Sequence, residues 1–292
     1  TALAALGFAP STADPSLFLH TDTSLPPFYV LVYVNDIVFA IADIEALALV
    51  KSELQKRHTC TDLGEVRSYL GLQITRDRAR RTITLTKSHM VHLVLQRFGF
   101  LFSSPQPTPL STGHSLSAPP SDESVELSGP YPELVGYLMY LMTCTRPDLA
   151  YPLSLLARYV APDASWVDDS ATQQSSQGYT FSLGFRSVSW WSTCSSSVLS
   201  SKLPRSPLVL YVDNKAMIAL CREHREEHRT KHITLRYFLA RELQQGGLLR
   251  LAYVATRANT ADIFTKALLP GDHQRFSTVL GLVPTLPHLL TA

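Results

Sequence analysis

The sequence predicts an α/β fold with two subdomains joined by a linker. Three observations predict it. Apolar β-prone runs and a helical stripe alternate in the first hundred residues, strand-like and helical segments alternate again after residue 163, and a stretch rich in proline and serine at 103–130, expected to be an extended linker, lies between them. The chain has 292 residues, of which 45% are hydrophobic, so it can form a core. Its net charge of +2 is too small to indicate a nucleic-acid partner by itself.

The first subdomain is predicted to begin with a β-hairpin. Residues 28–41 hold two apolar runs rich in β-branched and aromatic residues, and Asn35-Asp36 supplies turn-compatible residues between them. A helix is expected over 43–57, because apolar residues recur there at helical spacing behind Asp43, a suitable N-cap.

Two more strands and a broken helix are expected next. Residues 66–85 predict two strands around the arginine-rich turn 76–81, and we expect this hairpin to share one sheet with the first. Residues 134–160 are apolar and favour a helix, but Pro147 and Pro152 should break it into two or three pieces.

The second subdomain is predicted to be a hairpin followed by alternating strands and helices. The hairpin covers 178–190, with its turn near Gly184. Strands are expected at 208–212 and 248–254, two helical segments within 214–245, and a short helix at 259–268.

Cysteine usage and hydropathy restrict the location. The four cysteines are scattered without a Cys-x-x-Cys pair, which predicts reduced thiols rather than a disulfide framework or a zinc ribbon. No apolar stretch reaches membrane-spanning length without a charge or a proline. The first residues lack a basic segment and an initial Met, which favours a piece of a longer protein over a signal peptide. We expect an intracellular chain without a membrane partner; the compartment and the oligomeric state stay open.

Several short motifs, found in the same order along the sequence, resemble motifs of the copia-type retrotransposon Pol polyprotein. The hairpin motif Tyr33-Val34-Asn35-Asp36 resembles the Tyr-Val-Asp-Asp hairpin of its reverse transcriptase. Further matches are Asp62-Leu63-Gly64-Glu65, Tyr69-Leu70-Gly71-Leu72, the segment 83–100 ending in Arg97-Phe98-Gly99, and the segment 131–159 with Thr145-Arg146-Pro147-Asp148. The segments Tyr211-Val212-Asp213-Asn214 and 259–266 resemble its ribonuclease H motifs.

The resemblance implies a division of the chain, which it covers over most of residues 1–270. The expected parts are an α+β palm remnant with the start of the thumb (1–102), the linker (103–130), a helical connection segment (131–162), a truncated ribonuclease H-like α/β unit with an internal deletion (163–270), and a tail (271–292).

The resemblance also implies phosphoryl transfer assisted by two magnesium ions, which several carboxylates must hold at once. For polymerisation the family uses the hairpin pair and an aspartate on an upstream strand. Here Asn35 replaces the first acid, Asp36 remains, and no earlier acid lies in a matching word. An amide brings no negative charge and binds a hard cation less well. We therefore predict that Asp36 is a remnant magnesium ligand of an inactive polymerase.

The ribonuclease H words imply three further catalytic and magnesium-binding candidates, Asp163, Asp213 and Asp262. The family's glutamate is missing, because no Asp or Glu occurs between Ser170 and Val212. This gap predicts that the helix carrying the glutamate is deleted. The resemblance implies a second deletion at 161–163, which removes much of the first strand of the ribonuclease H-like unit. Asp163 can therefore also be read as an ordinary loop acid.

Nucleic-acid contacts are expected on a basic helical stretch. The candidates are Arg222, Arg225, Arg229, Lys231 and His232. A solvated helix with ion pairs between successive turns explains the same pattern. The turn 76–81 is a further basic cluster.

The ancestral activities are thus RNA-directed DNA polymerisation and cleavage of RNA in an RNA–DNA hybrid, with magnesium as cofactor. We predict that this copy performs neither. Two alternatives stay open: a residual nucleic-acid-binding module, and a weak magnesium-dependent ribonuclease H.

Overall fold

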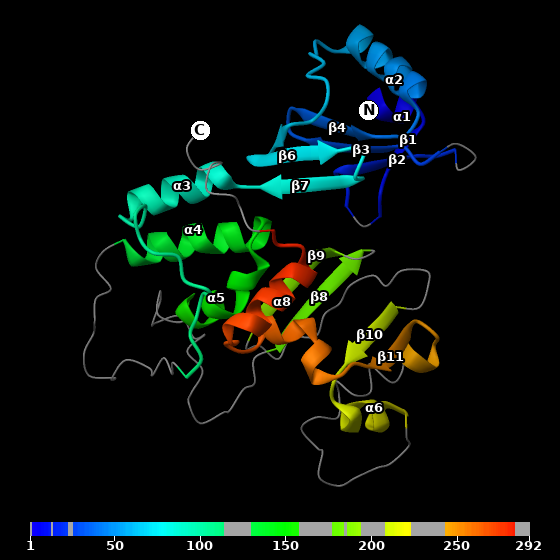
Figure 1. Cartoon of the computed structure of the whole chain (residues 1–292). Coiled ribbons are helices and arrows are strands. Elements are labelled where there is room, and N and C mark those ends of the chain that lie inside the picture. The colour runs from blue at the N-terminus through cyan, green and yellow to red at the C-terminus, as the bar shows by residue number, and fades with distance from the viewer. Residues whose placement is uncertain are drawn as a thin grey trace. The chain divides into compact units, whose positions relative to one another are not determined.

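The computed structural model describes residues 2–12, 14–22, 26–113, 130–157, 177–183, 186–193, 208–222 and 243–283 (Figure 1). The chain divides into two compact units, Thr1–Thr84 and Leu85–Ala292. Within the described ranges, no helix has the length and apolar character needed to cross a membrane.

The first unit contains a four-stranded antiparallel sheet in the order β1-β2-β3-β4. Its elements are α1 (Ala2–Ala5), β1 (Phe8–Pro10), β2 (Leu17–His20), β3 (Tyr29–Tyr33), β4 (Asp36–Ala40) and α2 (Ile44–Arg57). Helix α2 covers one face of the sheet, where Leu54 joins a buried core that includes Phe8, Phe28 and Val30 (Figure 1). The predicted hairpin is confirmed, whereas α1, β1 and β2 had not been predicted.

The turn of that hairpin lies one residue earlier than predicted. Tyr33 is paired with Asp36, so Val34 and Asn35 form the turn and Asp36 is the first residue of β4. The prediction of an Asn35-Asp36 turn was therefore wrong, because β pairing extends to Asp36 despite the turn preference of an Asn-Asp pair. Val34 takes a φ of 52°, a conformation that β-branched residues rarely adopt.

The predicted helix behind Asp43 is confirmed as α2. The Asp43 carboxylate accepts the N–H groups of Glu45 at 2.9 Å and Ala46 at 3.2 Å, which satisfies two otherwise unpaired donors of the first turn. The prediction of a single shared sheet was wrong.

A separate three-stranded sheet holds β5 (Ser68–Tyr69), β6 (Leu72–Asp77) and β7 (Thr82–Thr86). These strands are consecutive and joined by short turns, so each pairs with its neighbour in sequence. The turn between β5 and β6 contains Leu70 and Gly71, with φ of 49° and 72°.

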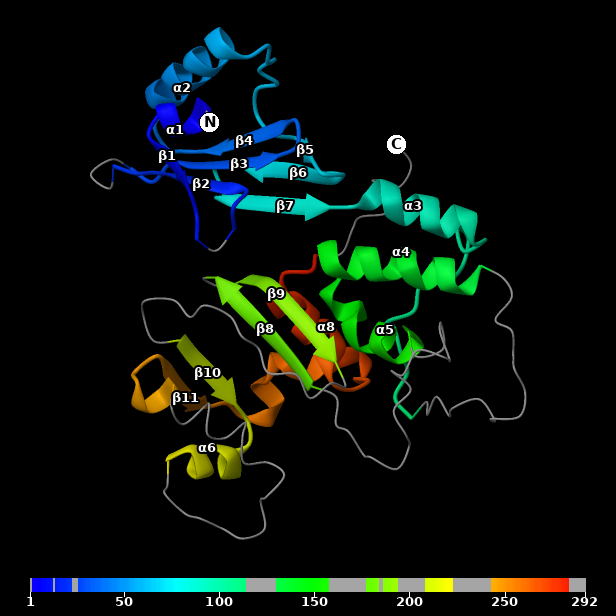
Figure 2. The ribbon, with the colours of Figure 1, turned by 180° about the vertical axis from the view of Figure 1, so that it is seen from behind.

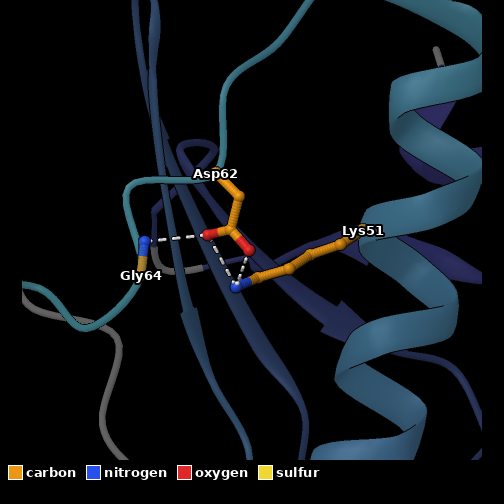
Figure 3. A network of polar contacts seen from close by, with 3 residues as sticks. All are labelled: Lys51, Asp62 and Gly64. Carbon is orange, nitrogen blue, oxygen red and sulfur yellow. Dashed lines mark hydrogen bonds and ion pairs between the residues drawn. The ribbon is translucent and has the colours of Figure 1, made fainter.

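The Asp62-Leu63-Gly64-Glu65 motif lies in the loop after α2 and is linked to that helix by polar contacts of Asp62 (Figure 3). The Lys51 ammonium donates to both Asp62 carboxylate oxygens at 2.8 and 2.9 Å, and the Gly64 N–H donates at 2.9 Å. Gly64 has a φ of 76°, which favours glycine. The Lys51 hydrogen bond, followed by the Gly64 N–H, lowers the pKa of Asp62. The motif therefore has a structural explanation.

The second unit begins with two helices that run in opposite directions. α3 (Ser88–Arg97) and α4 (Tyr131–Cys144) meet through an ion pair of 2.6 Å between Arg97 and Glu133. At the other end, the buried Lys87 side chain bonds to the Tyr140 hydroxyl.

The chain then breaks at Pro147 as predicted, giving a 3₁₀ helix η1 (Pro147–Leu149) and α5 (Ala150–Leu156). Pro152 does not break α5, because it lies in the first turn, where no N–H is needed. Of the predicted linker, residues 114–129 lie outside the described residues, and 103–113 contain no helix or strand.

The rest of the second unit contains a hairpin and a parallel strand pair, each in its own two-stranded sheet. Its elements are β8 (Gln177–Leu183), β9 (Arg186–Thr193), β10 (Leu208–Val212), α6 (Lys215–Arg222), β11 (Leu249–Tyr253), the 3₁₀ helices η3 (Thr256–Ala258) and η4 (Thr260–Phe264), and α8 (Pro270–Leu280). The predicted strands are confirmed; Gly184 lies outside the described residues.

The β8–β9 hairpin lies against α5 and α8, as Figures 1 and 2 show from opposite sides. The Ser192 hydroxyl donates to the Phe264 carbonyl at 2.7 Å, and Phe264 is fully buried with Phe276 and Leu280. Two predictions need correction here. The segment 259–268 contains one 3₁₀ helix, η4, rather than a regular short helix, and most of α8 lies within the predicted tail.

Candidate functional site

The candidate polymerase residue Asp36 is exposed at the first position of β4, next to the exposed Asn35. Tyr33 on β3 is its pairing partner. The hairpin thus presents one carboxylate and one amide side by side at its end.

Tyr69, from the family-like motif Tyr69-Leu70-Gly71-Leu72, interacts electrostatically with Asp36 of this hairpin. The Tyr69 hydroxyl is buried and has no hydrogen-bond partner in the described part of the chain. Burial, and then the negative charge of Asp36, raises the pKa of Tyr69. The sequence predicted no role for Tyr69, because its approach to Asp36 depends on how two sheets of the unit lie together.

Among the residues that the structure describes, the candidate magnesium ligands are not gathered in one cluster. A two-magnesium site needs several carboxylates around the ions. In the ranges that the structure describes, no three His, Cys, Asp or Glu side chains lie close enough together to hold a metal ion. The residue before Asp36 in the sequence is Asn35, whose amide brings no charge.

The three ribonuclease H aspartates have different surroundings. Asp213 follows β10 directly and is partly buried. Asp262 lies in η4, where its carboxylate forms an ion pair of 2.7 Å with Lys266. Asn259 caps η4 by accepting the Ala261 N–H at 3.2 Å. Asp163 lies outside the described residues. The Lys266 ammonium lies on one oxygen of the Asp262 carboxylate, Oδ2.

Comparison with known proteins decides the family. The family model described as "Reverse transcriptase (RNA-dependent DNA polymerase)" matches residues 1–112. The chain is 26% identical to the retrovirus-related Pol polyprotein from transposon TNT 1-94 of Nicotiana tabacum, over 92% of this chain and 26% of that protein. It is 27% identical to the Pol polyprotein from transposon RE1 of Arabidopsis thaliana, over 98% of this chain and 24% of that protein.

The chain belongs to the copia-type retrotransposon Pol polyproteins. It spans about a quarter of the length of these relatives. No solved structure matches it.

The alignments of this copia-type chain are longer than the chain itself. They extend over 338 residues for the tobacco relative and 354 for the Arabidopsis relative, whereas the whole chain has 292. Each relative therefore carries residues inside the aligned region that the copia-type chain lacks.

One family-like motif of the copia-type chain, Thr145-Arg146-Pro147-Asp148, contains an ion pair whose carboxylate is buried and whose arginine is partly exposed. The Arg146 guanidinium donates to both oxygens of Asp148 at 2.8 and 2.7 Å, and Asp148 is only 4% exposed. The hydrogen bond to Asp148 raises the pKa of Arg146. His273 on α8 lies close to this pair; burial lowers its pKa, while the Asp148 charge opposes and the Arg146 charge assists that change. This motif also has a structural explanation.

Most of the predicted basic helix lies outside the described residues. Arg222 ends α6, and Arg225, Arg229, Lys231 and His232 lie outside the described residues. Their contacts with nucleic acid stay a prediction.

Proposed function

We propose that the chain is a degenerate reverse transcriptase and ribonuclease H piece that catalyses neither DNA polymerisation nor RNA cleavage. The observation that carries the proposal is the replacement of the first hairpin aspartate by Asn35, which leaves Asp36 as the hairpin's carboxylate. In the family, this pair and a third aspartate hold two magnesium ions beside the incoming nucleotide, and a single carboxylate provides too few charged oxygen ligands for both ions.

The ribonuclease H part of the proposal rests on missing sequence. No acid occurs between Ser170 and Val212, where the family's glutamate is expected, and the relatives carry additional residues within the aligned region. The ancestral magnesium ligands are Asp163, Asp213 and Asp262.

Primer extension tests the polymerase half. The full chain and its Asn35→Asp variant are incubated with an RNA template, a DNA primer, deoxynucleotides and magnesium, with an active reverse transcriptase as positive control. We expect no extension by either, because Asn35→Asp restores a pair of carboxylates but no third donor. Extension by either chain above the no-enzyme background would contradict the proposal.

Cleavage of a labelled RNA–DNA hybrid tests the other half. We expect no magnesium-dependent cleavage. If cleavage occurs, the variants Asp213→Asn and Asp272→Asn separate its sources, since Asp272 is an acid of α8 paired with Arg275 and outside the candidate site. Activity that Asp213→Asn abolishes and Asp272→Asn preserves would establish a surviving ribonuclease H.

A further inference from the structure

Helix α8 carries a buried polar atom to which the described part of the chain offers no hydrogen bond. His273 is the fourth residue of α8, and its backbone N–H donates to the Leu269 carbonyl at 2.9 Å. The Nε2 atom of its ring is buried, and within the described ranges no protein group hydrogen-bonds to it. Nearly all buried polar atoms of folded proteins have a partner, either in the protein or in ordered water. Ordered water is therefore the first partner to consider for this ring.

A small cavity lies beside the ring. Its volume is about 10 Å³, which is about the smallest volume that holds one water molecule. Four polar residues line it, Asp148, Tyr151, Lys266 and His273, and the other lining residues are apolar. The cavity is thus too small for an organic ligand, and its wall is polar enough for a water molecule, which needs two to four polar partners.

Asp148 offers an acceptor on the same wall. The Arg146 guanidinium donates to each oxygen of the Asp148 carboxylate, at 2.8 and 2.7 Å, and each oxygen can accept a second hydrogen bond. Asp148 is only 4% exposed, so bulk water reaches these oxygens poorly. An unprotonated histidine nitrogen and a carboxylate are both acceptors, so a donor must lie between them if they are to be bridged.

We propose that one ordered water molecule occupies this cavity and bridges the His273 Nε2 atom to the Asp148 carboxylate. Water has two hydrogens, one for each acceptor, and Lys266 and Tyr151 carry further donor groups beside the same cavity. Water also suits the tautomer in which Nε2 carries the hydrogen, because its oxygen accepts. The bridge links α8 to the Thr145-Arg146-Pro147-Asp148 motif, and it does not depend on the proposed loss of catalysis.

A high-resolution crystal structure of the full chain tests the bridge directly. We expect one electron-density peak within about 3.2 Å of both the His273 Nε2 atom and an oxygen of Asp148. A direct hydrogen bond between His273 and Asp148 would overturn the proposal. Well-resolved side chains with no density between them would overturn it as well.

Magnetic relaxation dispersion of the solvent, which counts long-lived internal waters, tests the bridge in solution. We expect the count for the full chain to fall by about one in His273→Leu, because leucine cannot hydrogen-bond to the water. His89→Leu is the matched control, since it replaces an exposed histidine of α3 in the same unit. An unchanged count in His273→Leu, or an equal fall in both variants, would contradict the bridge.

The two measurements are independent of each other and of the proposed function. If His273→Leu does not fold, the crystal structure of the parent chain still decides whether the water is present. Primer extension or hybrid cleavage by the parent chain would contradict the proposed loss of activity without affecting either result.

Discussion

Asn35 differs from an aspartate only in one terminal group, an amide nitrogen in place of an oxygen. The change removes a negative charge and replaces an acceptor with a donor, so the end of the hairpin loses half of its formal charge. The hairpin itself still forms, with Tyr33 paired to Asp36. Loss of charge and retention of fold are therefore separable at this position.

Val34, its neighbour, is the residue where a substitution should stabilise the first unit. A β-branched residue at a φ of 52° is strained, and the side chain is 82% exposed, so it makes little packing contribution. Val34→Gly should raise the free energy of unfolding by up to about 1 kcal/mol, after allowance for the greater entropy of unfolded glycine. The urea midpoint measures it. Val34→Ala should gain less, because its Cβ keeps most of the strain; a lower midpoint for Val34→Gly would contradict the explanation.

His273 should make the stability of the second unit depend on pH. Burial lowers its pKa below 6.5, so the unfolded chain takes up a proton before the folded chain does. The contribution to stability is present above about pH 6.5 and should be lost as pH falls through the lower folded pKa. His273→Gln should flatten this dependence in denaturation curves recorded across that window.

The matched control for this substitution is a second histidine. His89 on α3 is exposed, so His89→Gln removes a histidine from the same unit without removing a buried ring. Equal pH slopes for His273→Gln and the parent chain would show that another group controls the acid response.

Among the elements, β8 and η4 approach so closely that only glycine fits between them. A Cβ added to Gly178 would lie 2.4 Å from the Phe264 Cβ. Gly178→Ala should therefore destabilise the second unit by about 1–3 kcal/mol, because the buried Phe264 cannot move aside freely. Thermal unfolding monitored by tryptophan fluorescence measures the change.

A matched glycine lies in α4. Nothing lies within 4 Å of a Cβ added to Gly136, and the residue is exposed inside the helix. Gly136→Ala should stabilise the unit by about 0.5–1 kcal/mol. The two alanine substitutions therefore have opposite expected signs, and the same sign for both would contradict the packing argument.

Local signals in the sequence account for the elements that were predicted. Helix α2 begins behind the Asp43 cap, and the break before α5 is at Pro147. Helix α8 was missed although it carries the same kind of signal, with Pro270 at its first position and Gly281 after its last. It was missed because the family resemblance ends at residue 270 and no family word covers the residues that follow.

Tertiary contacts account for what the sequence could not indicate. The approach of Tyr69 to Asp36 and the burial of Asp148 depend on tertiary packing, whereas the ion pair of Asp262 with Lys266 is a local contact between residues four apart. Asp36 and Asp262 were identified as candidates by the sequence motifs in which they lie. A motif does not determine which side chains a carboxylate contacts in the folded chain. The predicted roles of both residues in metal binding stay predictions.

At the scale of the whole molecule, protection from hydrogen exchange should differ between two regions. The sheet β1-β2-β3-β4 has a buried core of five residues, whereas the β10–β11 pair is supported by Cys221, Leu249 and Leu251. A two-stranded sheet is marginally stable. We expect peptides from β3 and β4 to exchange more slowly than peptides from β10 and β11, as measured by mass spectrometry. Equal protection would contradict this order.

The parallel pairing of β10 with β11 also has a consequence during synthesis on the ribosome. Leu208 pairs with Leu249, so β10 is complete before the first residue of its partner strand has been added. At translation rates of about 5–20 residues per second, β10 waits roughly 2–8 s for the intervening residues. During that interval the apolar strand lacks its partner and exposes unpaired backbone groups to other nascent chains. Translation speed through residues 213–248, as well as folding free energy, therefore controls how much of the newly made chain reaches the paired state without aggregating.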